Sequence, residues 1–376
     1  MLYLDHAAGG PVRREVLEAM APLLTGRFGN PSSVHTVGED VAAALEDARR
    51  RVGAVLDVRA GDVVFTSGGT EANNLAIAGI ALGARGRRPG HIVTTAIEHD
   101  SVLAVCRYLV RMHDYELDVI PVDAACRVDP ERIAGAVREH TAVVSVGYAN
   151  NEIGTVQDVA GVVGAVGPVP VHVDAVQAAG WLPLAGTGAA ALSIAGHKIG
   201  APQGIGVLAV RGRLPLEPTI HGGGQERGRR SGTQNVAGAV GFALALELAE
   251  RERTDAAARA ARARDAFTAL VLSGVAGAEL TGHRIDRLPG LASFVFAGTS
   301  GEAVLLELER RGIVTSSGSA CAAGSDEPSH VLTAIGLDAD ASRTAVRFSF
   351  DRAEPPEPTA LAGAVIDAVA AVRSGP

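Results

Sequence analysis

The sequence predicts an α/β protein in two parts, a large domain built on a mostly parallel seven-stranded sheet and a smaller α+β domain. Three observations lead to this fold class. The chain has 376 residues, more than one hydrophobic core usually serves. Short apolar runs alternate with helical patterns as far as Thr233, and beyond that residue the pattern changes.

The predicted strands are short runs rich in apolar and β-branched residues. Runs without polar alternation are typical of strands that are buried on both faces of a sheet. They occupy residues 63–65, 91–97, 117–122, 142–149, 169–176, 191–195 and 205–210.

Helical patterns separate the earlier strands. Residues 41–55, 71–82 and 101–112 carry apolar side chains at spacings of three and four, which indicates helices with one buried face. Strands and helices in alternation predict a parallel sheet that helices cover on both faces.

The second part begins with an Ala-, Glu- and Arg-rich region at residues 237–272, which predicts a long helix. Shorter strand-like pieces follow, and residues 361–372 predict a final helix. We expect residues 13–255 to form the large domain and residues 1–12 with 256–376 to form the small one.

Charge and cysteine content narrow the class of protein. The net charge of -8 disfavours a surface that neutralises phosphate backbones, so nucleic acid is not expected as a partner. The cysteines are Cys106, Cys126 and Cys321, too few and too scattered for a disulfide framework or a metal site. We expect a reducing, cytoplasmic location and no bound metal.

Residues 175–196 carry no charge and are long enough to cross a bilayer. Gly180, Pro183, Gly186 and Gly188 interrupt the stretch, which favours two buried strands joined by a loop over a membrane helix. The first residues have no basic region before an apolar run, so no signal peptide is expected.

Two polar residues follow predicted strands and indicate a cofactor. Asp174 ends one strand, and Lys198 follows a later one in Gly-His-Lys. Ligands bind at strand ends in open α/β sheets. A desolvated lysine can form a Schiff base with a carbonyl cofactor, and a buried aspartate can keep a pyridine nitrogen protonated, which suggests pyridoxal phosphate (PLP). A structural salt bridge between Asp174 and Lys198 is the alternative, and these two residues alone do not decide.

A glycine-containing turn at residues 66–71, Thr-Ser-Gly-Gly-Thr-Glu, follows a strand and opens a helix. Backbone N–H groups at a helix start bind phosphate well, although such turns also occur without a ligand. The turn is neither a Walker motif nor Gly-x-Gly-x-x-Gly, so a nucleotide is disfavoured.

Cys321 lies among small residues at 316–325, a composition typical of an exposed loop in which a thiolate can act as a nucleophile. Cys106 falls in a helical pattern and is expected in the core. Cys126 is expected in a loop near Asp123 and Asp129, whose negative charge disfavours a thiolate.

Taken in order, these pieces resemble the cysteine desulfurases, the class V aminotransferase branch of the fold-type I PLP enzymes. The resemblance covers nearly the whole chain. The segment around Cys321, with Glu-Pro-Ser at 327–329, resembles the longer-loop subgroup that hands sulfur to separate acceptor proteins. The matching segments are residues 3–5, 28–33, 66–71, 98–99, 150–154, 174–177, 196–198, 221–226, 230–233 and 346–349.

The resemblance implies a role for each matching site residue. Catalysis would rest on Lys198, which binds the cofactor and moves the proton of the substrate Cα, on His99, which stacks on the ring and takes part in proton transfer, and on Cys321, which accepts sulfur. Cofactor contacts would come from Gly69, Thr70, His99, Asn151, Asp174, Gln177, His197, Lys198 and Thr233, the last reaching the partner subunit of a homodimer. Substrate contacts would come from Asn30, Asn151 and Arg347, whose guanidinium would clamp the carboxylate.

The implied activity converts L-cysteine to L-alanine, leaving a persulfide on Cys321 whose outer sulfur passes to an acceptor protein for iron–sulfur cluster assembly or thiolation. The alternatives are a selenocysteine lyase, a class V aminotransferase that would not need Cys321, and a non-catalytic sulfur-relay scaffold that would bind no cofactor.

The chain departs from the family pattern at three places. Ala195 stands where a serine usually binds the phosphate, so cofactor affinity is expected to be lower unless Ser193 or a water takes its place. Gly9 and Gly10 replace two threonines, and His6 replaces a tyrosine or asparagine.

Overall fold

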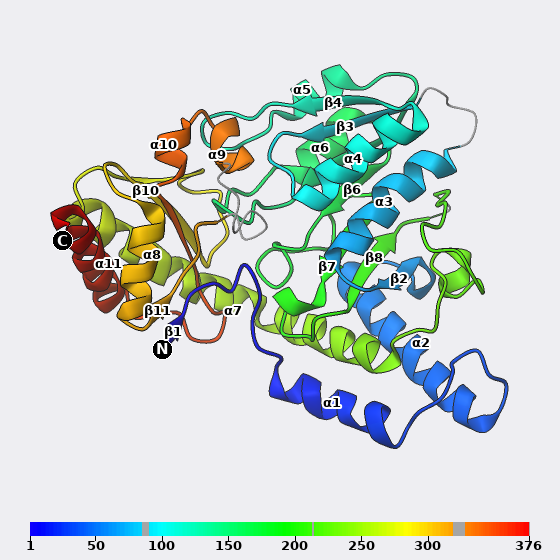
Figure 1. Cartoon of the computed structure of the whole chain (residues 1–376). Helices are drawn as coiled ribbons and strands as arrows, with labels where there is room; N and C mark the ends of the chain where they lie inside the picture. The colour runs from blue at the N-terminus through cyan, green and yellow to red at the C-terminus, as the bar shows by residue number, and fades with distance from the viewer. Residues whose placement is uncertain (85–89, 213, 319–327, 376) are drawn as a thin grey trace.

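The computed structural model describes residues 1–84, 90–212, 214–318 and 328–375, and Figure 1 shows the whole chain. Within that part of the chain the largest sheet has seven strands in the order β2-β8-β7-β6-β5-β3-β4. β8 pairs antiparallel with β2 and β7, and the other neighbours are parallel. The predicted mostly parallel sheet is confirmed. The strands are β2 Val63–Thr66, β3 His91–Thr95, β4 Glu116–Ile120, β5 Thr141–Gly147, β6 Val171–Asp174, β7 Ala191–Ala195 and β8 Gly206–Val210.

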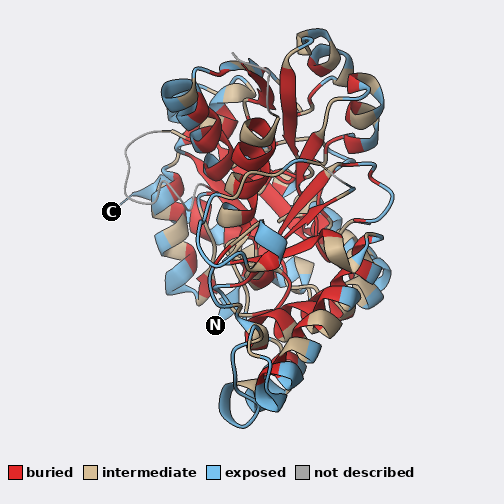
Figure 2. Ribbon diagram, turned by 90° about the vertical axis from the view of Figure 1, so that its right-hand side faces the viewer, coloured by how far each residue is buried: buried red, intermediate tan, exposed pale blue. Residues whose placement is uncertain are grey.

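Helices cover both faces of this sheet, because successive strand residues point to opposite sides. Val64, Ile92 and Val143 face α3 and α4, whereas their neighbours Val63 and Val93 belong to the core on the other face, with α2, α6 and α7. Figure 2 shows the strands and the inner helix faces as buried. The helices of this part are α1 Arg14–Thr25, α2 Thr36–Leu56, α3 Gly69–Gly83, α4 Asp100–His113, α5 Pro130–Ala136 and α6 Val159–Val166, with short 3₁₀ turns η1 Ala60–Asp62, η2 Gly196–Lys198 and η3 Glu226–Gly228.

One long helix, α7 Val236–Gly274, joins two hydrophobic cores. Its first half buries side chains such as Phe242 and Leu246 against the large sheet. Its second half buries Phe267 and Val271 in a separate core. The predicted domain boundary between residues 255 and 256 falls within this helix and remains a prediction.

The second core belongs to an antiparallel sheet ordered β12-β10-β9. Phe267 of α7 packs edge-on against Phe294 and Phe348 from this sheet. The N-terminal strand β1 pairs in parallel with β11, so the start of the chain lies beside the small domain (Figure 1). The remaining elements are β1 Leu2–Tyr3, β9 Ala278–Leu280, β10 Leu291–Phe296, α8 Gly301–Arg310, β11 Ile313–Val314, α9 His330–Ala334, α10 Ala339–Ser342, β12 Ala345–Ser349 and α11 Pro358–Ser374.

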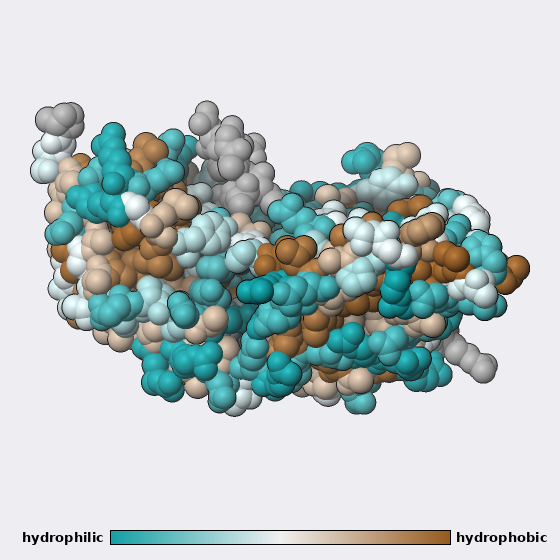
Figure 3. Space-filling model, turned by 90° about the horizontal axis from the view of Figure 1, so that it is seen from below, coloured by the Kyte–Doolittle hydropathy of each residue, from teal (hydrophilic) through white to brown (hydrophobic). Residues whose placement is uncertain are grey.

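None of the helices in the described residues is long and apolar enough to cross a membrane. The stretch at 175–196 instead contains a turn-rich loop that leads into β7, because its glycines and proline end any regular helix. Hydrophobic residues appear among hydrophilic ones on the face of the molecule seen from below (Figure 3).

Candidate functional site

A cavity of about 680 Å³ lies at the carboxyl ends of the central strands, where the large sheet meets the small domain. Parallel strands bring their carboxyl ends to one edge of the sheet, so residues that are distant in sequence converge there. Most of the residues assigned by resemblance line this cavity: Gly69, Thr70, His99, Asn151, Asp174, Gln177, His197, Lys198 and Arg347.

Asp174 ends β6 and is 9% exposed. Its carboxylate accepts hydrogen bonds from the backbone N–H of Val176 (3.0 Å) and from Nδ2 of Asn73 (2.7 Å). Both of these donors are neutral, and a buried carboxylate that accepts from neutral donors is suited to bind a cationic group, such as a protonated pyridine nitrogen.

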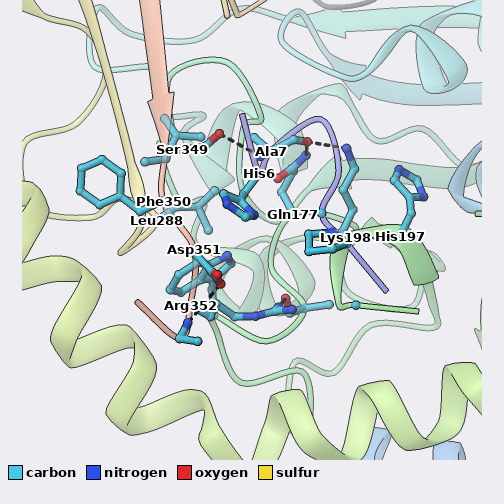
Figure 4. A pocket seen from close by; sticks show the side chains of 18 of the residues that line it. His6, Ala7, Gln177, His197, Lys198, Leu288, Ser349, Phe350, Asp351 and Arg352 are labelled. Atoms are coloured by element: carbon cyan, nitrogen blue, oxygen red, sulfur yellow. Dashed lines mark hydrogen bonds between the residues drawn. The ribbon is translucent and has the colours of Figure 1, made fainter. Parts of the chain in front are cut away.

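Lys198 lies in η2, directly after β7, and its Nζ donates to the carbonyl oxygen of Ala7 (Figure 4). Gln177 donates to the same oxygen through Nε2 at 2.9 Å. The backbone of residues 5–10 therefore passes directly over the lysine. Lys198 is also the only lysine in the whole sequence, in which the other basic side chains are arginines and histidines. This composition is a signal that could have drawn attention to Lys198.

The turn between β2 and α3 places Gly69 and Thr70 at the cavity wall. A Cβ atom on Gly69 would come within 2.8 Å of Cγ2 of Val176, so only glycine allows the backbone this approach. Since α3 is 15 residues long, its first N–H groups are suited to bind an anion such as a phosphate, and the assigned phosphate contacts of Gly69 and Thr70 remain predictions.

His197 was also assigned to the phosphate. Burial, together with the charge of Lys198, lowers the pKa of His197 to about 4. A neutral imidazole can still donate one hydrogen bond to an anion, but it adds no positive charge near neutral pH.

The structure also shows that Ser193 does not replace the missing serine at position 195. Ser193 is fully buried, and its Oγ lies 2.8 Å from Nε2 of His172. Ala195 lines the cavity, whereas Ser193 does not. The first of the two substitutes considered for the phosphate contact is therefore wrong.

Arg347, on β12, brings a cation to the opposite wall although it is only 1% exposed. Its Nη1 donates to the carbonyl oxygens of Asn151 (2.9 Å) and Gly318 (2.8 Å), and Nη2 pairs with Oδ1 of Asp5 at 2.5 Å. Nε has no hydrogen-bond partner among the described residues. A buried guanidinium with an unused donor is suited to bind a carboxylate.

Three carboxylate residues at this site had no assigned role. Asp5 belongs to a matching segment, but nothing in the sequence indicated that it would pair with Arg347. Glu98 is 2% exposed, and burial raises its pKa to about 8. Glu152 accepts a hydrogen bond from Oγ of Ser329 at 2.5 Å, and burial raises its pKa as well.

The three cysteines differ in what the structure shows of them. Cys106 is buried in α4, as expected, and burial raises the pKa of its thiol to about 12. Cys126 is buried too. Burial is the main cause that raises the pKa of its thiol, and nearby carboxylates contribute to the same shift. Cys321 lies outside the described residues. The described flanks of its segment both contact cavity residues, Gly318 through Arg347 and Ser329 through Glu152.

Asn30 and Thr233 do not reach the cavity of their own chain. Asn30 is exposed, and its side-chain oxygen accepts a hydrogen bond from the N–H of Ser32. Thr233 is exposed as well. The roles assigned to both residues remain predictions.

A lysine and a carboxylate at the strand ends of a mostly parallel sheet, beside a phosphate turn, define the class of fold-type I PLP-dependent enzymes. The comparisons with known proteins agree. The chain matches the family model for aminotransferase class-V over residues 2–357, and it belongs to that family.

The chain is similar along most of its length to curated proteins named cysteine desulfurases and to several solved structures. The cysteine desulfurase IscS of Dictyoglomus turgidum is 40% identical over 352 residues, which cover 93% of this chain and 89% of the relative. The solved structure of a NifS-like protein superposes with a TM-score of 0.91 at 34% identity, covering 98% of this chain and 99% of the other. SspA in complex with cysteine superposes with a TM-score of 0.81 at 32% identity, covering 93% and 98%.

Proposed function

We propose that this protein is a PLP-dependent cysteine desulfurase that converts L-cysteine to L-alanine and transfers the sulfur to Cys321. The observation that carries the proposal is the convergence of Lys198, Asp174 and Arg347 on one cavity. The relatives named cysteine desulfurases support it.

The donor set fits PLP. Lys198 would bind the aldehyde, Asp174 the ring nitrogen, and the N-terminus of α3 the phosphate. When bound, PLP supplies a protonated ring that withdraws electrons from the substrate Cα. Asp174 serves that chemistry by holding the proton on the ring nitrogen, and Lys198 is placed to remove and return the proton of the Cα.

Arg347 selects amino acid substrates. Its guanidinium is fixed by two backbone carbonyls and Asp5, so it does not have to become ordered when the substrate carboxylate binds. Nε of Arg347, which has no hydrogen-bond partner among the described residues, would provide one of the two parallel hydrogen bonds that a carboxylate takes from arginine.

The sulfur step balances without an external oxidant. The Cys321 thiolate forms a bond to the substrate sulfur as the carbon–sulfur bond breaks, and the electron pair of that bond stays on the carbon skeleton. Protonation of the skeleton gives L-alanine, while Cys321 keeps a persulfide. The outer sulfur then passes to the thiol of an acceptor protein, in iron–sulfur cluster assembly or thiolation.

A homodimer is part of the proposal, because Thr233 is exposed in the single chain and the family places this residue at the partner's phosphate. The loop before Thr233 is firmly held: Arg49 and Glu226 form a bidentate buried ion pair at 2.7 and 3.0 Å. Arg230 pairs with Glu71 at 2.8 Å, beside the phosphate turn.

The test compares the parent protein with Cys321→Ala. Both are incubated with L-cysteine while alanine and sulfide are measured, and the visible absorption of bound PLP is recorded. We expect the absorption band in both proteins and alanine formation in the parent alone. Equal activity in the two proteins would exclude Cys321 as the sulfur acceptor and favour a transaminase.

A further inference from the structure

Two residues without an assigned role connect Asp174 to His99 beneath the cavity. Asn73, on α3, is 1% exposed and donates through Nδ2 to Oδ2 of Asp174 (2.7 Å) and to Oγ of Ser101 (3.0 Å). Ser101, on α4, lies with its Oγ 2.8 Å from Nδ1 of His99. The four side chains form one chain of hydrogen bonds across two helices and a strand.

Asp174 sets the direction of these hydrogen bonds. The carboxylate oxygen accepts from the Asn73 amide, which turns its nitrogen toward Asp174. Oδ1 of Asn73 is left without a partner in the described part of the chain. Both hydrogens on Nδ2 are then used. Because Oγ of Ser101 accepts one of them, its own hydrogen is free to point at Nδ1 of His99.

The backbone of Ser101 reinforces this arrangement. Its N–H donates to the same Nδ1 of His99 at 3.1 Å, which makes His99 the N-terminal cap of α4. A ring nitrogen that accepts two hydrogen bonds carries no proton. The proton of a neutral His99 is therefore on Nε2.

We propose that Asn73 and Ser101 are positioning residues. Through their hydrogen bonds the carboxylate of Asp174 determines which tautomer His99 adopts. This inference rests on the proposed function, because Asp174 and His99 are its two ring-contacting side chains. Nε2 of His99 is then the nitrogen that gives and takes protons at the substrate, and the same hydrogen-bond chain keeps Asp174 oriented toward the ring nitrogen.

The test uses the PLP-loaded proteins Asn73→Leu, Ser101→Ala and the double variant. Leucine matches the shape of asparagine but cannot donate. Without that donor Asp174 is no longer held toward the ring nitrogen and stabilises the ring proton less well. The ring then withdraws less charge from the Lys198 nitrogen, which would keep its proton to higher pH. The visible band should therefore titrate at a higher pH in Asn73→Leu, by about one pH unit.

The double variant separates one connected chain from two independent effects. Ser101→Ala should move the titration in the same direction by a smaller amount. The double variant should move no further than Asn73→Leu, because Ser101 acts on Asp174 through Asn73. Shifts that add in the double variant, or no shift in Asn73→Leu, would overturn the proposal.

A second measurement reads the tautomer directly. In histidine-labelled protein, nitrogen NMR signals of His99, assigned with His99→Gln, should show the proton on Nε2 in the parent. A proton on Nδ1 would contradict the inference.

Thermal unfolding checks that each variant folds, with Asn73→Ala as the replacement if Asn73→Leu does not. If the parent shows no PLP band at all, the proposed function fails; if the band is present and the shifts add, only this inference fails.

Discussion

The two walls of the cavity are built differently. On the large-domain wall, Asp174 ends one strand and Lys198 follows the next, and β6 and β7 are paired in parallel so that Asp174 lies opposite Ser193. On the other wall, Arg347 is held by Asp5, which is 342 residues away in the sequence. The first wall follows from the order of the strands, whereas the second forms only when the N-terminal segment and the small domain come together.

This difference suggests a division of labour. The large-domain wall holds the groups proposed to bind the cofactor and move protons, on strands of the large sheet and on the helices that pack against it. The other wall carries the proposed substrate clamp, Arg347, and both described flanks of the Cys321 segment. Changes in the first wall should therefore affect the proton-transfer chemistry, and changes of Arg347 and Asp5 in the second should affect substrate binding and stability.

The largest effect is expected from Lys198→Ala, which removes the amine from the large-domain wall. Cysteine turnover should fall roughly 10³-fold or more, because both the cofactor linkage and the proton transfer at Cα are lost. Borohydride reduction of the PLP-loaded parent, followed by peptide mass spectrometry, should place the cofactor on Lys198. The sequence has no other lysine, so a PLP adduct at the amino terminus alone would contradict the assignment.

On the opposite wall, Arg347→Lys should raise the KM for L-cysteine roughly ten- to hundredfold, because lysine keeps the charge but not the fork of parallel donors. The position of the PLP band should not change. Asp5→Asn is the matched variant, since it leaves Arg347 in place but removes the ion pair, and it should lower the free energy of unfolding by about 2 kcal/mol. A displaced PLP band in Arg347→Lys would show that the two walls are not separate.

Sequence patterns predicted the large-domain wall well. Apolar runs predicted the positions of the strands, and Asp174 and Lys198 were found at the ends of two of them. The carboxyl ends of parallel strands lie at one edge of the sheet, so residues that follow different strands come close together there. The resemblance to a known family added His99, Gln177 and Arg347, which line the same cavity.

The remaining features depend on contacts that no local pattern encodes. The pairing of Asp5 with Arg347 and the carbonyl of Ala7 over Lys198 require the N-terminal segment to return across the cavity. Asn73 was passed over because one asparagine in an apolar helix looks the same whether it is structural or connects two catalytic groups. Ser193, one of the two substitutes considered for the missing serine, is unsuitable because its hydroxyl contacts His172 on the neighbouring strand.

Glu98 forms a contact between the two walls of the cavity. It follows β3 in the large sheet, and its backbone carbonyl oxygen lies 2.9 Å from Nε2 of His330 in α9. Burial raises the pKa of Glu98 from 4.5 to about 8. Between these values the folded protein keeps a proton that the unfolded chain has lost, so stability falls as the pH rises through this window. The glutamine of Glu98→Gln does not titrate. At a pH above about 8 this variant should have a free energy of unfolding about 2 kcal/mol higher than that of the parent, and the difference should become smaller as the pH is lowered.

Urea unfolding at several pH values measures this difference. The Glu139→Gln variant is the control, since Glu139 is a surface residue away from the substrate cavity. An advantage of Glu98→Gln that is independent of pH would mean that Glu98 is charged in the folded protein throughout.

The smallest expected effect is on the cysteines of the large domain. Cys106 and Cys126 are buried, and burial raises the pKa of both thiols. Neither should react with iodoacetamide in the native protein at about pH 8, because the thiolate is the nucleophile and its population is very small. Peptide mapping should find carbamidomethylation of both only after denaturation. Modification of Cys106 or Cys126 in the native protein, at a rate close to that of a free thiol, would show that the large-domain wall opens to solvent and would remove the contrast with the wall that carries the Cys321 segment.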